Sequence, residues 1–186
     1  GLGFGWHLLT SPLAYQQHLG TTLGEIGTIY DCSSGTCFFS EIAEVSSGEG
    51  FYIETNQNIN ANFAGTVLPD YTLPLNQGWN LIGNPLVTSI DVDSLIIIHN
   101  GQELSFQSAL DTGFVSPIPI TFDNSLSMHK GVTTLEPSKG FWIYSYHDNT
   151  FISFIPHIEV ENFEYTGTHW NLTFMARETN PDTYGN

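Results

Sequence analysis

One stretch decides the fold, Gly78-Trp79-Asn80-Leu81-Ile82-Gly83-Asn84-Pro85-Leu86, because an earlier copy of it stands at Gly5-Trp6-His7-Leu8-Leu9-Thr10-Ser11-Pro12-Leu13. Each copy closes on a second matched segment, Gly50-Phe51-Tyr52-Ile53 in the first and Gly140-Phe141-Trp142-Ile143 in the second. A third opening, Trp170-Asn171-Leu172, follows the second closing. Internal repetition indicates a repeated structural unit. We therefore expect the matched residues to build that unit rather than to form a functional site.

Strand patterns dominate the rest of the chain. Short aromatic and β-branched runs, separated by Gly, Asn, Asp and Pro, predict strands at residues 36–42, 51–55, 95–99, 141–146 and 150–155. Trp6 and Trp79 are each expected to open a further strand. The Asn100-Gly101 pair predicts a two-residue hairpin, and residues 147–149 predict another tight turn. Helix is expected only in two short segments, residues 15–19 and 104–110, so the sequence predicts an all-β fold.

The repeat predicts how these strands are organised. We expect an antiparallel β-sandwich built from a duplicated unit, with residues 1–76 as the first repeat and 77–156 as the second. The two repeats could form two small sandwiches or two packed halves of one, and their small size favours packed halves. Residues 157–186 are expected to begin a third β module. The second repeat has extra length around residues 109–123, where Pro117 and Pro119 predict a surface loop.

The charge of the chain is strongly one-sided. Lys130, Lys139 and Arg177 are the only Lys and Arg residues against 19 carboxylates, for a formal net charge of −16. Such a surface repels phosphate backbones and anionic lipids, so we expect no nucleic-acid partner. The sequence also has no apolar run long enough to span a bilayer, so no membrane insertion is expected.

Cys32 and Cys37 flank a short Gly- and Ser-containing segment that reads as a turn between strands. This spacing favours a Cys32–Cys37 disulfide across a hairpin tip, and the alternative is a pair of reduced, unrelated thiols. The Lys-poor, Thr- and Asn-rich composition favours an extracellular protein, where a disulfide persists. From its two ends, the chain is expected to be an internal or processed piece of a longer secreted protein.

The two openings, together with Leu135-Glu136-Pro137-Ser138-Lys139-Gly140-Phe141-Trp142-Ile143, resemble a repeat found in large secreted and surface proteins of Bacteroidota. Many of those proteins are type IX secretion substrates. The resemblance covers roughly residues 5–154 and implies β-sandwich modules at the cell surface or outside the cell. Because proteins with this repeat share no single activity, the resemblance names no ligand.

The sequence offers few chemical sites. Asp91, Asp93 and Asp123 are the calcium candidates, because carboxylates on loops can converge on this ion, and we expect no other cofactor. Asp93-Ser94-Leu95 resembles the O-glycosylation tripeptide of the same bacterial proteins, which makes Ser94 the candidate modification site. Neither a paired-histidine metal motif nor a Gly-x-Ser-x-Gly elbow is present. We therefore predict no catalytic residues and no enzyme activity.

The aromatic residues fall into two groups, which bear on two functional hypotheses. Those in the repeated strands are expected in the core, namely Trp6, Phe51, Trp79, Phe141 and Trp142. The candidate sugar-stacking platforms are Tyr15, Tyr30, Tyr71, Phe114, Tyr144 and Tyr146. The favoured function is a non-catalytic structural or adhesive module (stalk, adhesin or extracellular filament component). The alternative is a carbohydrate-binding module accessory to a secreted enzyme. Expected partners are other β modules or neighbouring subunits, through strand exchange by residues 158–176, and glycans.

Overall fold

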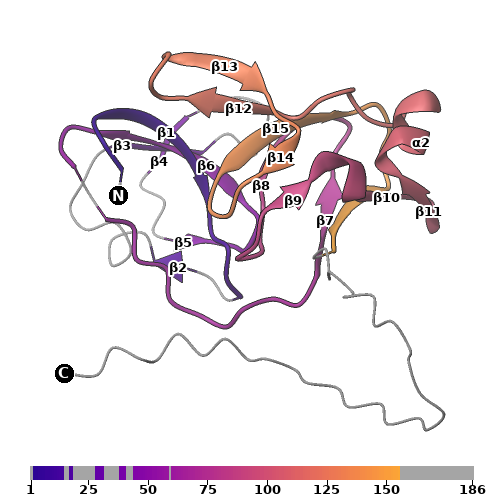
Figure 1. Cartoon of the computed structure of the whole chain (residues 1–186), viewed down its shortest axis with the longest axis horizontal. Helices are drawn as coiled ribbons and strands as arrows, with labels where there is room; N and C mark the ends of the chain where they lie inside the picture. Colours follow the sequence, from indigo (N-terminus) through magenta and orange to yellow (C-terminus); the bar gives the residue numbers. More distant parts are fainter. Residues whose placement is uncertain are drawn as a thin grey trace, which may run out of the picture.

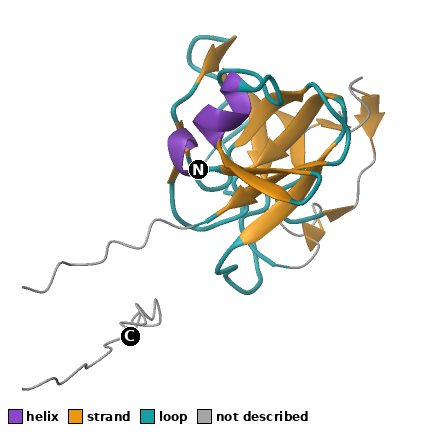
Figure 2. Cartoon of the chain, turned by 90° about the vertical axis from the view of Figure 1, so that its right-hand side faces the viewer, coloured by secondary structure: helices purple, strands orange, loops and turns teal. Residues whose placement is uncertain are grey.

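The structure is a computed structural model that describes residues 2–14, 17–18, 28–31, 38–40, 44–58 and 60–155. Most of these residues lie in antiparallel strands, and the described part contains one α-helix and one 3-10 turn (Figures 1 and 2). The prediction of an all-β fold is therefore confirmed. No helix in the described ranges has the length and apolar character needed to cross a membrane.

The matched segments of the repeat pair with each other in the same register in both copies. In the first copy, β1 (Gly5–Thr10) pairs with β6 (Gly50–Thr55), from Gly5 opposite Thr55 to Thr10 opposite Gly50. In the second, β8 (Gly78–Gly83) pairs with β15 (Gly140–Ser145), from Gly78 opposite Ser145 to Gly83 opposite Gly140. Opening and closing thus form one antiparallel ribbon in each copy.

The two ribbons contact each other reciprocally. The Thr10 N–H donates to the Ser138 carbonyl at 3.1 Å, and the Gly83 N–H donates to the Gly48 carbonyl at 2.9 Å. Thr10 and Gly83 are equivalent positions of the repeat, and so are Ser138 and Gly48. Each opening strand is therefore completed by the turn that precedes the closing strand of the other copy.

This junction explains the glycine that begins each closing segment. A Cβ atom on Gly50 would lie 2.8 Å from Cγ of Leu81, and one on Gly140 would lie 2.8 Å from Cγ of Leu8. Leu8 and Leu81 are the third residues of the two Trp-x-Leu openings. Close packing at such a site leaves no room for another side chain.

The strands of the described residues form three sheets of four strands and two short two-strand pairs. The first sheet runs β1-β6-β3-β4, with β3 at Thr28–Asp31 and β4 at Phe38–Ser40. The second runs β13-β12-β15-β8, with β12 at Ile120–Asp123 and β13 at Met128–Gly131. The third runs β11-β10-β16-β7 and has these bounds: β7 Tyr71–Leu75, β10 Ile96–His99, β11 Gln102–Ser105 and β16 Thr150–Phe154. The two-strand pairs join β14 (Thr134–Leu135) with β9 (Ile90–Asp91), and β2 (Gln17–His18) with β5 (Glu44–Val45).

The largest core lies between the second and third sheets, where Phe106, Phe141, Ile143, Ile152 and Phe154 are almost fully buried. Strand β7 precedes residue 77, yet it pairs with β16 along its whole length. The division into repeats at residue 76 stays a prediction.

The extra length of the second copy is more ordered than a surface loop. Helix α2 (Phe106–Asp111) is capped by the Ser105 hydroxyl, which accepts from the Ser108 N–H. The chain then runs beside β15, where the Ser116 N–H donates to the Tyr144 carbonyl at 2.9 Å, and continues into β12. The loop predicted at residues 109–123 is therefore shorter than expected: residues 112–119 lie outside helix and strand, whereas the two ends of the segment belong to α2 and β12. Val115 and Ser116 within the loop are buried.

The two predicted turns and one of the two predicted helices agree with the structure. β10 and β11 form the hairpin predicted from Asn100-Gly101, whose φ values of 50° and 81° match the turn that this pair favours. The turn at residues 147–149 connects β15 and β16 as expected. Helix α2 falls inside the predicted helical segment 104–110 except for its last residue. The other predicted helix, at residues 15–19, lies almost entirely outside the described residues, which include only Gln17 and His18 there.

Candidate functional site

Strand β15 separates the core from an aromatic surface by simple alternation. Phe141, Ile143 and Ser145 point inward and are buried, so Trp142 and Tyr144 lie on the opposite face. Trp142 is directly across from Leu81 of β8, and Tyr144 is directly across from Trp79. The Trp-x-Leu motif of the second copy therefore faces away from the main core.

Trp79 is the most informative residue of this surface, because 46% of its area is exposed. Its ring packs edge-on against Tyr144, with centroids 5.3 Å apart, and Tyr144 contacts Tyr146 at 4.8 Å. Tyr146 is 47% exposed. The prediction that Trp79 is a core residue is wrong, and Trp6 and Trp142 are only partly buried. Phe51 and Phe141, by contrast, are confirmed as core residues.

A shallow groove lies beside Trp79. It has a volume of about 300 Å³, and its walls are Trp79, Ile120, His129 and Trp142. Ile120 is opposite Trp142 in the pairing of β12 with β15, and His129 comes from β13. The β12–β13 hairpin thus forms one wall of the groove, and Figure 1 shows it projecting above the sheet toward β1.

A hydrogen-bonded chain fixes this wall. The Trp142 Nε1–H donates to the Tyr52 hydroxyl at 2.9 Å, and that hydroxyl lies 2.8 Å from Nε2 of His129. An indole N–H can only donate, so the Tyr52 proton is free to be donated to His129. Burial raises the pKa of Tyr52, while the hydrogen bond from Trp142 acts in the opposite direction. Tyr52 therefore stays neutral and links both copies of the repeat to the hairpin.

Further rings extend this surface over the first sheet. Trp6 lies 4.9 Å from Tyr30 and 6.3 Å from Tyr52, measured between ring centroids. Phe122 lies 6.3 Å from Tyr52 and 5.2 Å from His129. We call the whole set the aromatic face, and its members are Trp6, Tyr30, Tyr52, Trp79, Phe122, His129, Trp142, Tyr144 and Tyr146.

The structure separates the predicted sugar-stacking platforms. Tyr30, Tyr144 and Tyr146 belong to the aromatic face. Tyr71 packs against the main core, and Phe114 stacks on His99 with centroids 4.4 Å apart. Tyr15 lies outside the described residues. The sequence did not select Trp79, Trp142 or His129, although period-two alternation with buried Phe141 and Ile143 was the signal that could have placed Trp142 outward.

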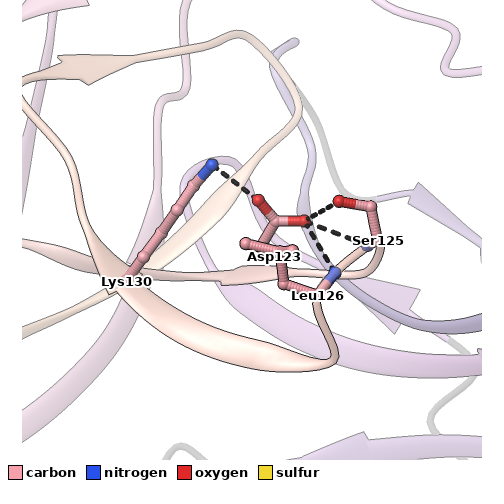
Figure 3. A network of polar contacts seen from close by, with 4 residues as sticks. All are labelled: Asp123, Ser125, Leu126 and Lys130. Carbon is pink, nitrogen blue, oxygen red and sulfur yellow. Dashed lines mark hydrogen bonds and ion pairs between the residues drawn. The ribbon is translucent and has the colours of Figure 1, made fainter.

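The three predicted calcium ligands do not converge. Asp123 is held by the Lys130 ammonium at 2.7 Å and by the Ser125 hydroxyl at 2.6 Å (Figure 3). Asp91 accepts from the Thr134 hydroxyl at 3.0 Å, and Asp93 is exposed in the 3-10 turn Val92–Ser94. Within the described ranges, no group of three or more His, Cys, Asp or Glu side chains is placed to hold a metal ion.

The remaining predicted sites stay predictions. Ser94 is half-buried, and its hydroxyl donates to the Asp91 carbonyl at 2.7 Å. Cys32 and Cys37 lie outside the described residues, as do the exchange segment 158–176 and the third opening at Trp170.

Comparison of this chain with family models, with curated proteins and with solved structures finds no match.

Proposed function

We propose that this chain is a non-catalytic adhesive β module of a secreted or cell-surface protein, and that its aromatic face binds carbohydrate. The observation that carries the proposal is the exposure of Trp79 beside Tyr144 and Tyr146. Exposed apolar patches on a folded domain mark interaction sites. Rings with a polar edge suit sugars, which present apolar C–H faces together with hydroxyl groups.

Charge supports a neutral ligand for the groove. The chain carries a formal net charge of −16, yet the four residues that line the groove include no carboxylate. The groove lining also has no Lys or Arg to offset the repulsion that an anionic ligand would meet from the acidic surface, so a neutral sugar suits this groove better. His129 adds a polar group to walls that are otherwise apolar, which is the usual composition of a small-ligand site.

Rigidity supports binding as well. The hydrogen bonds of Tyr52 to Trp142 and His129 hold the groove walls in place before any ligand arrives. A preformed site loses less side-chain entropy on binding than a flexible one. The duplicated build and the resemblance to bacterial surface repeats favour an extracellular location for such a module.

The test is a glycan array probed with the full chain and with two matched variants. Trp79→Ala removes a ring from the groove, whereas Phe151→Ala removes a ring that is 39% exposed on β16, in another sheet. We expect Trp79→Ala to weaken binding about tenfold or more, as loss of a central aromatic anchor does. Phe151→Ala should bind like the original chain. Equal binding by all three proteins would contradict the proposal.

A purely structural role predicts a different result. In that case no glycan binds, and Trp79→Ala instead changes association with a neighbouring module of the same protein. Analytical ultracentrifugation of the chain with its neighbouring modules would reveal that association.

A further inference from the structure

The β12–β13 hairpin has a second face. Phe122 is opposite His129 in the pairing of these strands, and both belong to the aromatic face. Thr121 is opposite Lys130 one position away, so these two side chains point to the other side of the hairpin. A hollow of about 450 Å³ lies on that side, and we call it the lysine cavity.

The lysine cavity has two positively charged side chains in its lining. Both lysines of the sequence, Lys130 and Lys139, line it, although the sequence has only three Lys and Arg residues. The Lys130–Asp123 pair neutralises itself, because Lys130 and the Ser125 hydroxyl hold the pKa of Asp123 well below its ordinary value (Figure 3). Lys139 has no ion pair in the part of the chain that the structure describes.

His7 adds a hydrogen-bond acceptor to the cavity. Its side chain is only 7% exposed and lines the same cavity. Nε2 lies 2.8 Å from the Gly3 carbonyl, which can only accept, so Nε2 carries the hydrogen. Nδ1 of the neutral ring is then an acceptor, and it has no partner among the described residues. A hydroxyl donor on a ligand would satisfy it.

The floor of the cavity is apolar. Leu135 and Phe141 line it, together with the half-buried Val132. Glu136 stands on the rim as the one carboxylate in the lining that makes no ion pair with a described residue. The cavity therefore combines one ammonium and one carboxylate that make no ion pair with a described residue, together with one acceptor nitrogen and an apolar floor.

We propose that the lysine cavity binds a hydroxylated organic acid, with the carboxylate at Lys139 and a hydroxyl at His7. The sugar acids, such as hexuronic acids, are the class that meets this description. The choice of sugar acids rests on the proposed glycan-binding function, whereas the site itself does not, because it lies on the opposite side of the hairpin from Trp79. The acid reaches the cavity either as a free molecule or as one residue of an acidic polysaccharide.

The experiment is an NMR titration of the ¹⁵N-labelled full chain with sodium glucuronate, with glucose as the uncharged counterpart. We expect glucuronate, and not glucose, to shift the amide signals of Thr121 and Gly140 at the cavity wall. A glucuronate oligomer distinguishes the two sources of ligand. If the natural ligand is one residue of an acidic polysaccharide, the glucuronate oligomer should bind more tightly than the monomer. If the natural ligand is a free acid, the monomer should bind more tightly.

Two exposed residues of opposite charge give matched variants. Lys139→Gln should weaken glucuronate binding about fivefold, and Glu136→Gln should strengthen it by a similar factor. Added salt should weaken binding to the original chain, because the attraction to Lys139 is screened. Trp79→Ala should leave glucuronate binding unchanged, which separates this site from the aromatic face.

Three outcomes would overturn the proposal. The first is equal shifts with glucose and glucuronate. The second is glucuronate affinity that does not respond to Lys139→Gln and Glu136→Gln in opposite directions. The third is binding that strengthens with salt, since the net charge of −16 would then outweigh Lys139.

Discussion

Trp142 donates its indole N–H to the hydroxyl of Tyr52 at 2.9 Å, and these two residues occupy the same position in the two copies of the repeat. Each follows the Gly-Phe pair that begins its closing strand. The duplicated ribbons therefore meet at equivalent residues, and the difference between Trp and Tyr turns this meeting into a donor–acceptor pair. The same Tyr52 hydroxyl reaches His129, which makes it the link between repeat and groove.

Removing that hydroxyl should cost stability. Tyr52→Phe leaves the Trp142 N–H and His129 Nε2 without their partner in a partly buried site, which costs about 1–3 kcal/mol. Urea unfolding measures this change. Tyr144→Phe is the control, because no hydrogen bond of its hydroxyl is found within the described residues, and its free energy of unfolding should stay within about 0.5 kcal/mol. Equal effects of the two substitutions would contradict the importance of the Tyr52 hydrogen bonds.

Tyr52→Phe should also change how the stability of the chain depends on pH in the alkaline range. Burial raises the pKa of Tyr52 in the folded chain above its ordinary value of 10.0. The stability from this shift is present below pH 10 and is lost as pH rises toward the folded-state pKa, because the unfolded chain releases the proton first. Stability of the original chain should therefore fall more steeply above pH 10 than that of Tyr52→Phe.

The glycines at the junction should not tolerate a methyl group. Gly140→Ala would place Cβ 2.8 Å from Leu8 Cγ and 3.0 Å from the Leu9 carbonyl oxygen. Overpacking of this kind costs about 1–3 kcal/mol, measured as a loss in the free energy of unfolding. Gly3→Ala meets only one atom, Asn58 Oδ1, at 3.8 Å and serves as the control. A stable Gly140→Ala variant would show that the two ribbons can separate at little cost.

Asp123 should titrate below the ordinary range. The hydrogen bond from Lys130, followed by that from Ser125, lowers its pKa from the usual 3.8. The stability from this shift is present above pH 3.8 and is lost as pH falls toward the folded-state pKa. Carboxyl ¹³C shifts measure the titration directly, and Lys130→Gln should move its midpoint upward toward 3.8. A titration midpoint near 3.8 for Asp123 in the original chain would show that Lys130 does not lower its pKa.

The predicted Cys32–Cys37 disulfide can be tested by alkylation of the two cysteines. Asp31 of β3 is opposite Phe38 of β4, and Cys32 and Cys37 are the next residues inward. We expect an alkylating reagent to label neither cysteine in the native chain and both after reduction. Labelling before reduction would support the alternative of two free thiols.

The sequence predicts the strand pairs better than it predicts which way they face. Matched segments and an Asn-Gly pair are local signals, so the ribbons and the β10–β11 hairpin follow from them. In the second opening, period-two alternation places Trp79 and Leu81 on one face of the strand and Ile82 on the other. Because both faces carry apolar residues, alternation alone cannot tell which face is turned to the core. Packing against α2 and β16 buries the Ile82 side, and no local signal reports that packing.

The residues of the candidate site are likewise only partly predictable from the sequence. Tyr144 and Tyr146 are among the rings predicted from the sequence as sugar-stacking platforms, and both belong to the aromatic face. His129 reaches the groove only through the β12–β13 hairpin, and the first strand of this hairpin lies in the segment 109–123 that the prolines predicted to be a loop. The hairpin brings Lys130 within 2.7 Å of the Asp123 carboxylate, a contact that the sequence does not show, and the calcium interpretation of Asp123 stays a prediction.

The reciprocal junction has a consequence for folding. The Thr10 N–H is satisfied by Ser138, which lies in the last third of the sequence, so the first opening strand stays incomplete until most of the chain has been synthesised. Contacts so distant in sequence slow folding. Because the closing turn of one molecule fits the opening strand of another as well as its own, concentrated refolding should yield domain-swapped dimers, detectable by size-exclusion chromatography. Refolding to monomer alone at every concentration would show that the second copy docks before neighbouring chains can meet.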